Sequence, residues 1–205
     1  MTSRRLFVAA ALCAASGVRA DPSAALAREV RARLAQEPVL RGSFEQRKQV
    51  KGFRNPVLAT GEFVISRQKG VLWRTREPFA STLVVMRDRV LARQADGQAR
   101  SLSARDEPGV GMVGETLFGI LAADVSVLSQ RFRLDGELAG DSRWRLVLVP
   151  REAAVARWLA RLELDGDRFL RNMRLFEGAG DQTHIRLAGH APDAVLTPEE
   201  ESQFA

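Results

Sequence analysis

Short runs of β-favouring residues, each followed by a turn signal, fill this chain from residue 40 to residue 188. Turn residues such as Gly52, Asn55-Pro56 and Lys69-Gly70 separate the runs. Parallel strands need long crossover connections, and such connections do not separate these runs, so the pattern predicts an antiparallel sheet of hairpins. The predicted strands are Leu40–Gln49, Gly61–Ser66, Val71–Thr75, Ser81–Arg87, Val90–Gln94, Arg131–Leu138, Trp144–Val149, Ala160–Asp165, Leu170–Glu177 and Thr183–Ala188.

The predicted helices are few. One begins at Pro22-Ser23, with Ser23 as its N-cap, and ends before Pro38. Its apolar stripe consists of Leu26, Val30 and Leu34. A second, Glu115–Ala123, is apolar on all sides and therefore needs cover from the rest of the protein. Glu152–Leu159 adds a helical turn, and the tail from Pro192 is predicted to be polar and extended.

A sheet of about ten strands curls or closes instead of remaining flat. We therefore predict a mainly β (α+β) fold. It is a single curved antiparallel sheet that forms an unclosed half-barrel, with the helices as a lid over its open face. Hydrophobic residues make up 45% of the chain, which supplies the core of one domain.

The first twenty residues have the pattern of a secretory signal peptide. Met1–Arg5 is a short basic start, Leu6–Ala15 is apolar, and Val18-Arg19-Ala20 offers a cleavage site before Asp21. The alternative is a lipoprotein acylated at Cys13, which is disfavoured because Leu12 stands where a small residue is expected. We therefore predict a signal peptide over residues 1–20 and one exported domain over residues 21–205.

Composition argues against several classes of function. The formal net charge of +6 falls to +3 without the three arginines of residues 1–20, since 28 basic and 25 acidic side chains remain. A charge this small indicates no nucleic-acid partner. Cys13 is the only cysteine, so the exported domain has no thiol nucleophile, disulfide or cysteine-based metal site.

Two motifs resemble sites but lack the context that such sites require. Gly109, Gly111 and Gly114 match a dinucleotide-binding spacing, yet a charged segment ending in proline precedes them in place of a buried strand. His184 and His190 have no further ligand or partner at a suitable spacing. No nucleophile–base pair can be assembled, so we expect neither an enzyme nor a bound cofactor or metal.

Another set of motifs agrees with the strand pattern. Gly42-Ser43-Phe44-Glu45-Gln46 is followed by Gly61-Glu62-Phe63, Val71-Leu72-Trp73 and Glu77-Pro78, and later by Asp181-Gln182-Thr183-His184-Ile185. These residues, in this order, resemble the LolA-like family of periplasmic carriers that take lipoproteins to the outer membrane. The resemblance spans nearly the whole chain after residue 20.

The resemblance implies a latch between sheet and lid. In that family an arginine at a strand end hydrogen-bonds the lid backbone, and Arg67 holds the matching position. Leu34 on the first helix matches a lid contact. The second predicted helix supplies the other lid residues, Phe118, Ile120, Leu121 and Ala122. The family usually has proline after the arginine, where this chain has Gln68.

The resemblance also implies a hydrophobic groove in which an acyl chain lies between sheet and lid. The candidate groove residues are Phe63, Ile65, Trp73, Leu83, Val85, Leu146, Leu148, Met173 and Leu175. Side chains of a strand alternate between its two faces, so a register shift of one residue would replace this list with its neighbours. The sequence leaves open which face is turned inward.

The implied function is a periplasmic carrier that shelters acyl chains of lipoproteins, or of another lipid, for transfer toward the outer membrane. Its partners would be the acylated cargo, an inner-membrane donor protein and an outer-membrane acceptor protein, and we expect a monomer. The alternative is a lipid-sensing regulatory module of similar fold. Such modules usually carry a second domain and a membrane tether.

Overall fold

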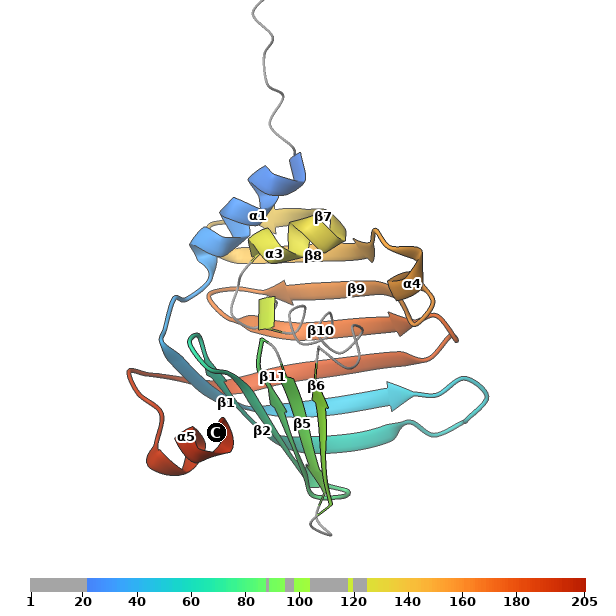
Figure 1. The fold of residues 1–205 in the computed structure, drawn as a ribbon. Helices are drawn as coiled ribbons and strands as arrows, with labels where there is room; N and C mark the ends of the chain where they lie inside the picture. Colours follow the sequence, from blue (N-terminus) through green and yellow to red (C-terminus); the bar gives the residue numbers. More distant parts are fainter. Residues whose placement is uncertain (1–21, 88, 95–97, 104–117, 120–124) are drawn as a thin grey trace, which may run out of the picture.

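The computed structural model describes residues 22–87, 89–94, 98–103, 118–119 and 125–205. Within these residues, eleven strands form one antiparallel sheet with four short helices around it (Figure 1). The strands are β1 (Val39–Gln49), β2 (Val57–Ser66), β3 (Gly70–Glu77), β4 (Ser81–Val85), β5 (Arg89–Gln94), β6 (Ala99–Ser103), β7 (Phe132–Ala139), β8 (Arg143–Pro150), β9 (Leu159–Gly166), β10 (Leu170–Glu177) and β11 (Gln182–Asp193). The helices are α1 (Pro22–Arg33), α3 (Val125–Arg131), α4 (Ala153–Ala156) and α5 (Pro198–Gln203).

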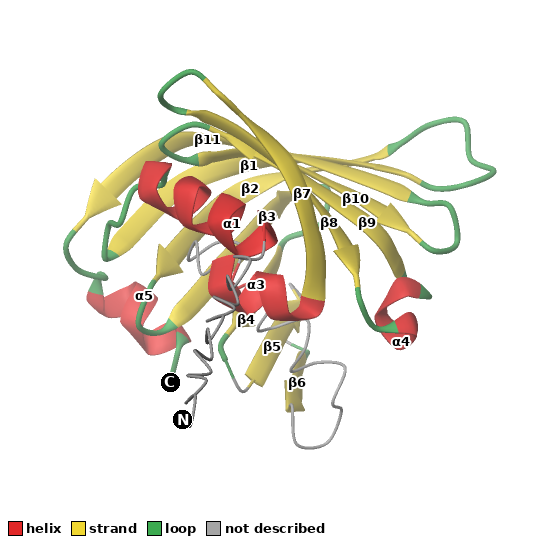
Figure 2. Cartoon of the chain, turned by 90° about the horizontal axis from the view of Figure 1, so that it is seen from above, coloured by secondary structure: helices red, strands yellow, loops and turns green. Residues whose placement is uncertain are grey.

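The strand order is β6-β5-β4-β3-β2-β1-β11-β10-β9-β8-β7. Every neighbouring pair except β1 and β11 is also consecutive in sequence, so hairpins build both halves and one long-range pairing joins them. β6 and β7 form the two edges, and the sheet does not close between them. The predicted fold class, an unclosed and curved antiparallel sheet, is confirmed. Figure 2 shows the sheet curving around α1 and α3.

Each face of the sheet has its own apolar cluster. The concave cluster joins Val30 of α1 and Leu128 of α3 to inward side chains such as Phe63, Val71 and Val85. The convex cluster holds the alternate residues of the same strands, Val39, Val64, Leu72, Val84 and Met86, together with Phe204 next to α5. Strands β2 to β4 therefore carry an apolar layer on each face, and α5 lies on the convex one.

Two glycines of β1 and β2 lie opposite two phenylalanines. Gly42 pairs with Phe63, and Phe44 pairs with Gly61. A Cβ atom on Gly42 would lie 2.4 Å from the Phe63 ring, and one on Gly61 would lie 2.6 Å from the Phe44 ring and 2.0 Å from the Arg74 carbonyl oxygen. Each ring thus lies against the backbone of the opposite strand, where only glycine leaves room for it.

The structure corrects the sequence interpretation of the tail, of two missed elements and of one N-cap. The polar tail is not extended, because β11 continues to Asp193 and α5 follows it. β6 and α3 were not predicted. Ser23 is not the N-cap but lies inside α1, where its Oγ donates to the Leu134 carbonyl oxygen at 3.2 Å. The predicted helix at 115–123 lies outside the described residues except for 118–119.

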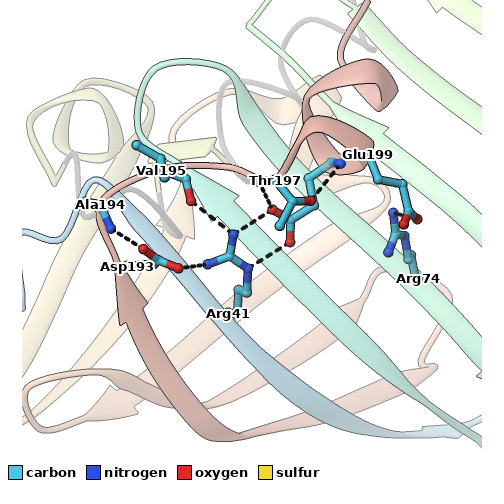
Figure 3. A network of polar contacts seen from close by, with 8 residues as sticks. Arg41, Arg74, Asp193, Ala194, Val195, Thr197 and Glu199 are labelled. Carbon is cyan, nitrogen blue, oxygen red and sulfur yellow. Dashed lines mark hydrogen bonds and ion pairs between the residues drawn. The ribbon is translucent and has the colours of Figure 1, made fainter.

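A network around Arg41 fixes α5 to the convex face (Figure 3). The Arg41 guanidinium donates to both carboxylate oxygens of Glu200 at 2.8 and 2.6 Å and to Asp193 at 2.7 Å. Glu200, which is only 7% exposed, also completes a capping box with Thr197 at the start of α5. The hydrogen bond from Arg41 is the main factor that lowers the pKa of Glu200.

Replacing Gly61 by alanine tests the close approach of the strands. In a strand interior, alanine is ordinarily more stable than glycine by about 0.5–1 kcal/mol. Here we expect Gly61→Ala to destabilise the protein by about 1–3 kcal/mol, because the new methyl group meets a backbone carbonyl and an aromatic ring. Urea unfolding shows whether the free energy of unfolding rises or falls. Ala59→Gly on the same strand measures the ordinary difference between alanine and glycine. A stabilised Gly61→Ala protein would contradict the steric explanation.

Replacing Arg41 by alanine leaves Glu200 buried without its cation. We expect Arg41→Ala to cost about 2–4 kcal/mol of unfolding free energy at pH 7. Arg74→Ala is the matched control, since its partner Glu199 is exposed, and it should cost less than about 0.5 kcal/mol. Equal losses of unfolding free energy in the two variants, measured by denaturant unfolding, would contradict the role given to the buried pair of Arg41 and Glu200.

The same pair predicts a pH dependence. Because the pKa of Glu200 is lowered in the folded state, its contribution is complete above the ordinary value of 4.5 and is lost as the pH falls through the lowered value. The stability difference between wild type and Arg41→Ala should therefore shrink on acidification below pH 4.5. A difference that stays constant there would rule out this role for Glu200.

Candidate functional site

The concave face has an aromatic floor made by β1, β2 and β3. The ring centroids of Phe44 and Trp73 lie 3.9 Å apart with planes 24° from parallel, and those of Phe63 and Trp73 lie 6.2 Å apart at 20°. Both phenylalanines are buried, whereas Trp73 is half-buried. The stack therefore presents its indole ring at the surface of the floor.

An apolar cavity of about 160 Å³ adjoins this floor. Strands β1, β3, β4, β10 and β11 supply its walls, and every lining residue except one is apolar. The lining residues are Gln46, Val71, Trp73, Leu83, Val85, Met173 and Ile185. An engineered apolar cavity of about 150 Å³ in another protein binds benzene. This cavity, as it stands, therefore admits a group of about that size.

All nine predicted groove residues belong to the concave cluster. Trp73, Leu83, Val85 and Met173 line the cavity. The other five pack in the surrounding core: Phe63, Ile65, Leu146, Leu148 and Leu175. The structure thus turns all nine side chains toward the concave side, and their role in holding a lipid stays a prediction.

Three lining residues were missing from that list. Val71 lies two residues before Trp73, so strand alternation was sufficient to find it. Ile185 pairs with Met173 across β10 and β11, which only the register shows. Gln46 follows Phe44 on the same face of β1, but nothing in the sequence marks a glutamine as part of an apolar wall.

Arg67, in the turn after β2, binds the segment that connects α1 to β1 (residues 34–38, the α1–β1 connector). Its Nε donates to the Glu37 carbonyl oxygen and its Nη2 to the Ala35 carbonyl oxygen, each at 2.9 Å. Its backbone N–H donates to the Pro38 carbonyl oxygen at 3.1 Å. Burial and the nearby Arg31 lower the pKa of Arg67, but an arginine side chain keeps its charge in proteins.

The turn between β9 and β10 holds the same connector. The Ala35 N–H donates to the Arg168 carbonyl oxygen at 2.8 Å, and the Arg168 side chain donates to Glu37 at 2.9 Å. Asp167 fixes this turn, because its carboxylate accepts the Phe169 N–H and its carbonyl oxygen accepts the indole N–H of Trp144. Two turns of the sheet therefore hold the C-terminal end of α1 through hydrogen bonds to main-chain and side-chain groups of the connector.

Comparison with known families decides the affiliation of this chain. Residues 36–200 match the family model described as outer membrane lipoprotein carrier protein LolA. The chain belongs to the LolA family. The resemblance inferred from the glycine, phenylalanine and tryptophan motifs is thereby confirmed. A comparison with curated proteins finds no match.

Solved structures share the fold of this LolA family member at low sequence identity. A LolA superfamily protein from Nitrosomonas europaea is 8% identical with a TM-score of 0.52, and the match covers 91% of this chain and 98% of that one. A putative outer membrane lipoprotein-sorting protein domain from Vibrio parahaemolyticus is 10% identical with a TM-score of 0.51, and the match covers 88% of this chain and 97% of that one. A DUF1329 family protein from Desulfovibrio piger is 10% identical with a TM-score of 0.51, and the match covers 91% of this chain and 100% of that one. At these identities the likeness shows the fold alone.

The lid residues expected from the LolA resemblance are only partly described. Leu34 is half-buried against the concave cluster, and Phe118 is buried with the Arg87 guanidinium 4.7 Å from its ring centroid. Ile120, Leu121 and Ala122 lie outside the described residues, as do Gly109, Gly111 and Gly114. The signal peptide predicted for residues 1–20 also lies outside them and stays a prediction.

Both histidines of this LolA family member are engaged by neighbours. His190 stacks on Phe169 and its Nδ1 lies 3.0 Å from Arg171 Nη1, while His184 Nε2 lies 3.2 Å from Asn172 Oδ1. Burial is the main cause that lowers the pKa of each histidine. In the described part of the chain, no cluster of three or more histidine, cysteine or acidic residues is placed to hold a metal ion. No helix there is long and apolar enough to cross a membrane.

Replacing Arg67 by leucine tests its hold on the connector. We expect Arg67→Leu to speed hydrogen exchange of the Leu34 and Ala35 amides roughly tenfold or more, because two hydrogen bonds from a charged group are lost. The amides of β8 and β9 should exchange as in the wild type, since the sheet core is untouched. Arg76→Leu, which removes an exposed arginine paired with Glu62, is the control. Unchanged exchange at residues 34 and 35 would refute this assignment.

Proposed function

We propose that this protein is a periplasmic carrier that shelters an acyl chain of a lipoprotein, or of another lipid, for transfer toward the outer membrane. The observation that carries this proposal is the apolar cavity in the concave face, walled by strands from both halves of the sheet. Membership of a family described as outer membrane lipoprotein carriers supports it. The reaction is binding and release, with no covalent step, so the protein is not an enzyme.

The energetics favour a sheltered passage. Exposing an acyl chain to water costs ~0.8 kcal/mol for each methylene, or roughly 12 kcal/mol for sixteen carbons. A cavity of about 160 Å³ accepts only a small part of such a chain. The cargo therefore enters by separating α1 and α3 from the sheet, and the structure corresponds to the closed state of the carrier.

In this proposal Arg67 is the latch of the closed state. It holds the connector at the end of α1, so that releasing two hydrogen bonds frees the helix to swing without unfolding a strand. Cargo then shifts the balance between a closed and an open arrangement of similar free energy. Gln68 in place of the family's proline does not prevent these contacts.

The cellular setting follows from the same proposal. Residues 1–20 direct export and residues 21–205 form the carrier domain, which acts as a monomer in the periplasm. An inner-membrane protein donates the cargo and an outer-membrane protein accepts it.

Extraction of an acylated peptide from vesicles tests the carrier. The protein is incubated with phosphatidylglycerol and phosphatidylethanolamine vesicles that hold a fluorescent lipopeptide, the vesicles are sedimented, and peptide in the supernatant is measured. Wild-type protein should carry peptide into the supernatant. Leu83→Gln should lower this amount roughly tenfold, because a polar group enters an apolar wall.

Leu91→Gln is the matched control, since Leu91 is also half-buried but packs on the convex cluster. It should extract peptide as the wild type does, and thermal unfolding verifies that both variants are folded. Failure of the wild type to extract any peptide would refute the proposed function. An equal loss of peptide extraction in both variants would show that the concave cavity is not where the acyl chain binds.

A further inference from the structure

The concave side of β1 changes from apolar to polar along the strand. Phe44, Gln46 and Lys48 lie on the same face of this strand, two residues apart. Phe44 is buried in the aromatic stack, Gln46 lines the cavity, and Lys48 binds Glu177 at 2.8 Å and Asp181 at 3.5 Å. A ligand lying along this strand thus meets hydrocarbon first, then an amide, then charged groups.

Two hydrogen-bonding side chains of the cavity have no partner within the described residues. The structure records no hydrogen bond for the Gln46 amide or for the Trp73 indole N–H in that part of the chain, although both residues line the cavity. One buried tryptophan and one half-buried glutamine elsewhere in the described residues are paired. The indole N–H of Trp144 donates to the Asp167 carbonyl oxygen at 2.7 Å, and the Gln49 amide donates to the Phe53 carbonyl oxygen at 2.6 Å.

We infer that Gln46 and Trp73 together hydrogen-bond the carbonyl oxygen of an acyl ester or acyl amide whose hydrocarbon chain occupies the cavity. An indole can only donate and a primary amide can donate, so the ligand group that satisfies both is an acceptor. A few placed polar groups in an otherwise apolar pocket fix the orientation of a ligand. This inference rests on the proposed function and adds the chemistry at the head of the chain.

The polar end and the apolar wall together select among acyl compounds. Lys48 is shared between Glu177 and Asp181. The Lys51 side chain lies beside Gly180, next to Asp181, so two lysines accompany two carboxylates and the charges at this end balance. Burying a free fatty carboxylate against the apolar wall therefore costs more than burying a neutral head. The cavity therefore prefers a neutral ester or amide, with the tail toward Phe44 and the head toward Lys48.

Binding of three probes with a twelve-carbon acyl chain, and of tridecane as the hydrocarbon reference, tests this inference. Methyl dodecanoate, N-methyldodecanamide, sodium dodecanoate and tridecane are delivered from cyclodextrin at pH 8, and each displaces an apolar fluorescent dye from the protein. We expect Gln46→Met, a substitution of similar shape, to weaken the ester and the amide roughly three- to tenfold and to leave tridecane within about twofold. Trp73→Phe should act in the same direction, and Gln49→Met should change none of the four. Wild-type protein should bind the ester more tightly than dodecanoate.

The outcomes separate this inference from the proposed function. If ester and tridecane both bind but Gln46→Met weakens them equally or not at all, the carbonyl contact is wrong and the carrier stands. Dodecanoate binding as tightly as the ester would overturn the preference for a neutral head. If no probe displaces the dye from wild-type protein, the carrier and the carbonyl contact both fail. Thermal unfolding of each variant shows that any loss is not a loss of fold.

Discussion

The reciprocal pairing of glycine and phenylalanine between β1 and β2 sets the shape of the concave face. Because Gly42 faces Phe63 and Gly61 faces Phe44, each ring lies against bare backbone instead of standing upright on the sheet. The rings leave room for Trp73 to stack over them, and the cavity opens beside that stack. With a Cβ atom at either glycine, the opposite ring would have to rise into the space that forms the cavity.

The two faces of the sheet are covered in physically different ways. On the convex face, Phe204 packs on apolar side chains and the buried Glu200 is bound by Arg41, so moving α5 would strand a carboxylate without its cation. On the concave face, α1 rests on apolar side chains, and its C-terminal connector is held by hydrogen bonds to Arg67 and Arg168. When the connector moves, the donors and acceptors of these hydrogen bonds can bond to water instead. The cover on the concave side is therefore the easier one to displace.

Local pattern predicted the strands but not the elements that depend on distant partners. Period-two alternation with turn residues was sufficient for the hairpins. The alternation grouped Trp73 and Met173 with their neighbours, but only the folded structure shows that this group is turned inward. β6 was missed because Leu102 is the only large apolar residue in Ala99–Ser103. α5 has a readable start at Thr197, Pro198 and Glu200, but its partner Arg41 lies 159 residues away. Within the described residues the Gln46 and Trp73 donors have no recorded partner, and this depends on the packing of the cavity, which no local pattern contains.

The small volume of the cavity determines how a carrier of this kind would release its cargo. Seating a long acyl chain requires the concave side chains to give up contacts with α1 and α3, so the net binding free energy is the gain from burying the chain minus the loss of that packing. Both quantities scale with apolar area, and they therefore largely cancel. A carrier built in this way shields most of the chain from water yet binds it with a modest net free energy. An acceptor with a preformed groove, which has no such packing to give up, then withdraws the chain without an external source of energy.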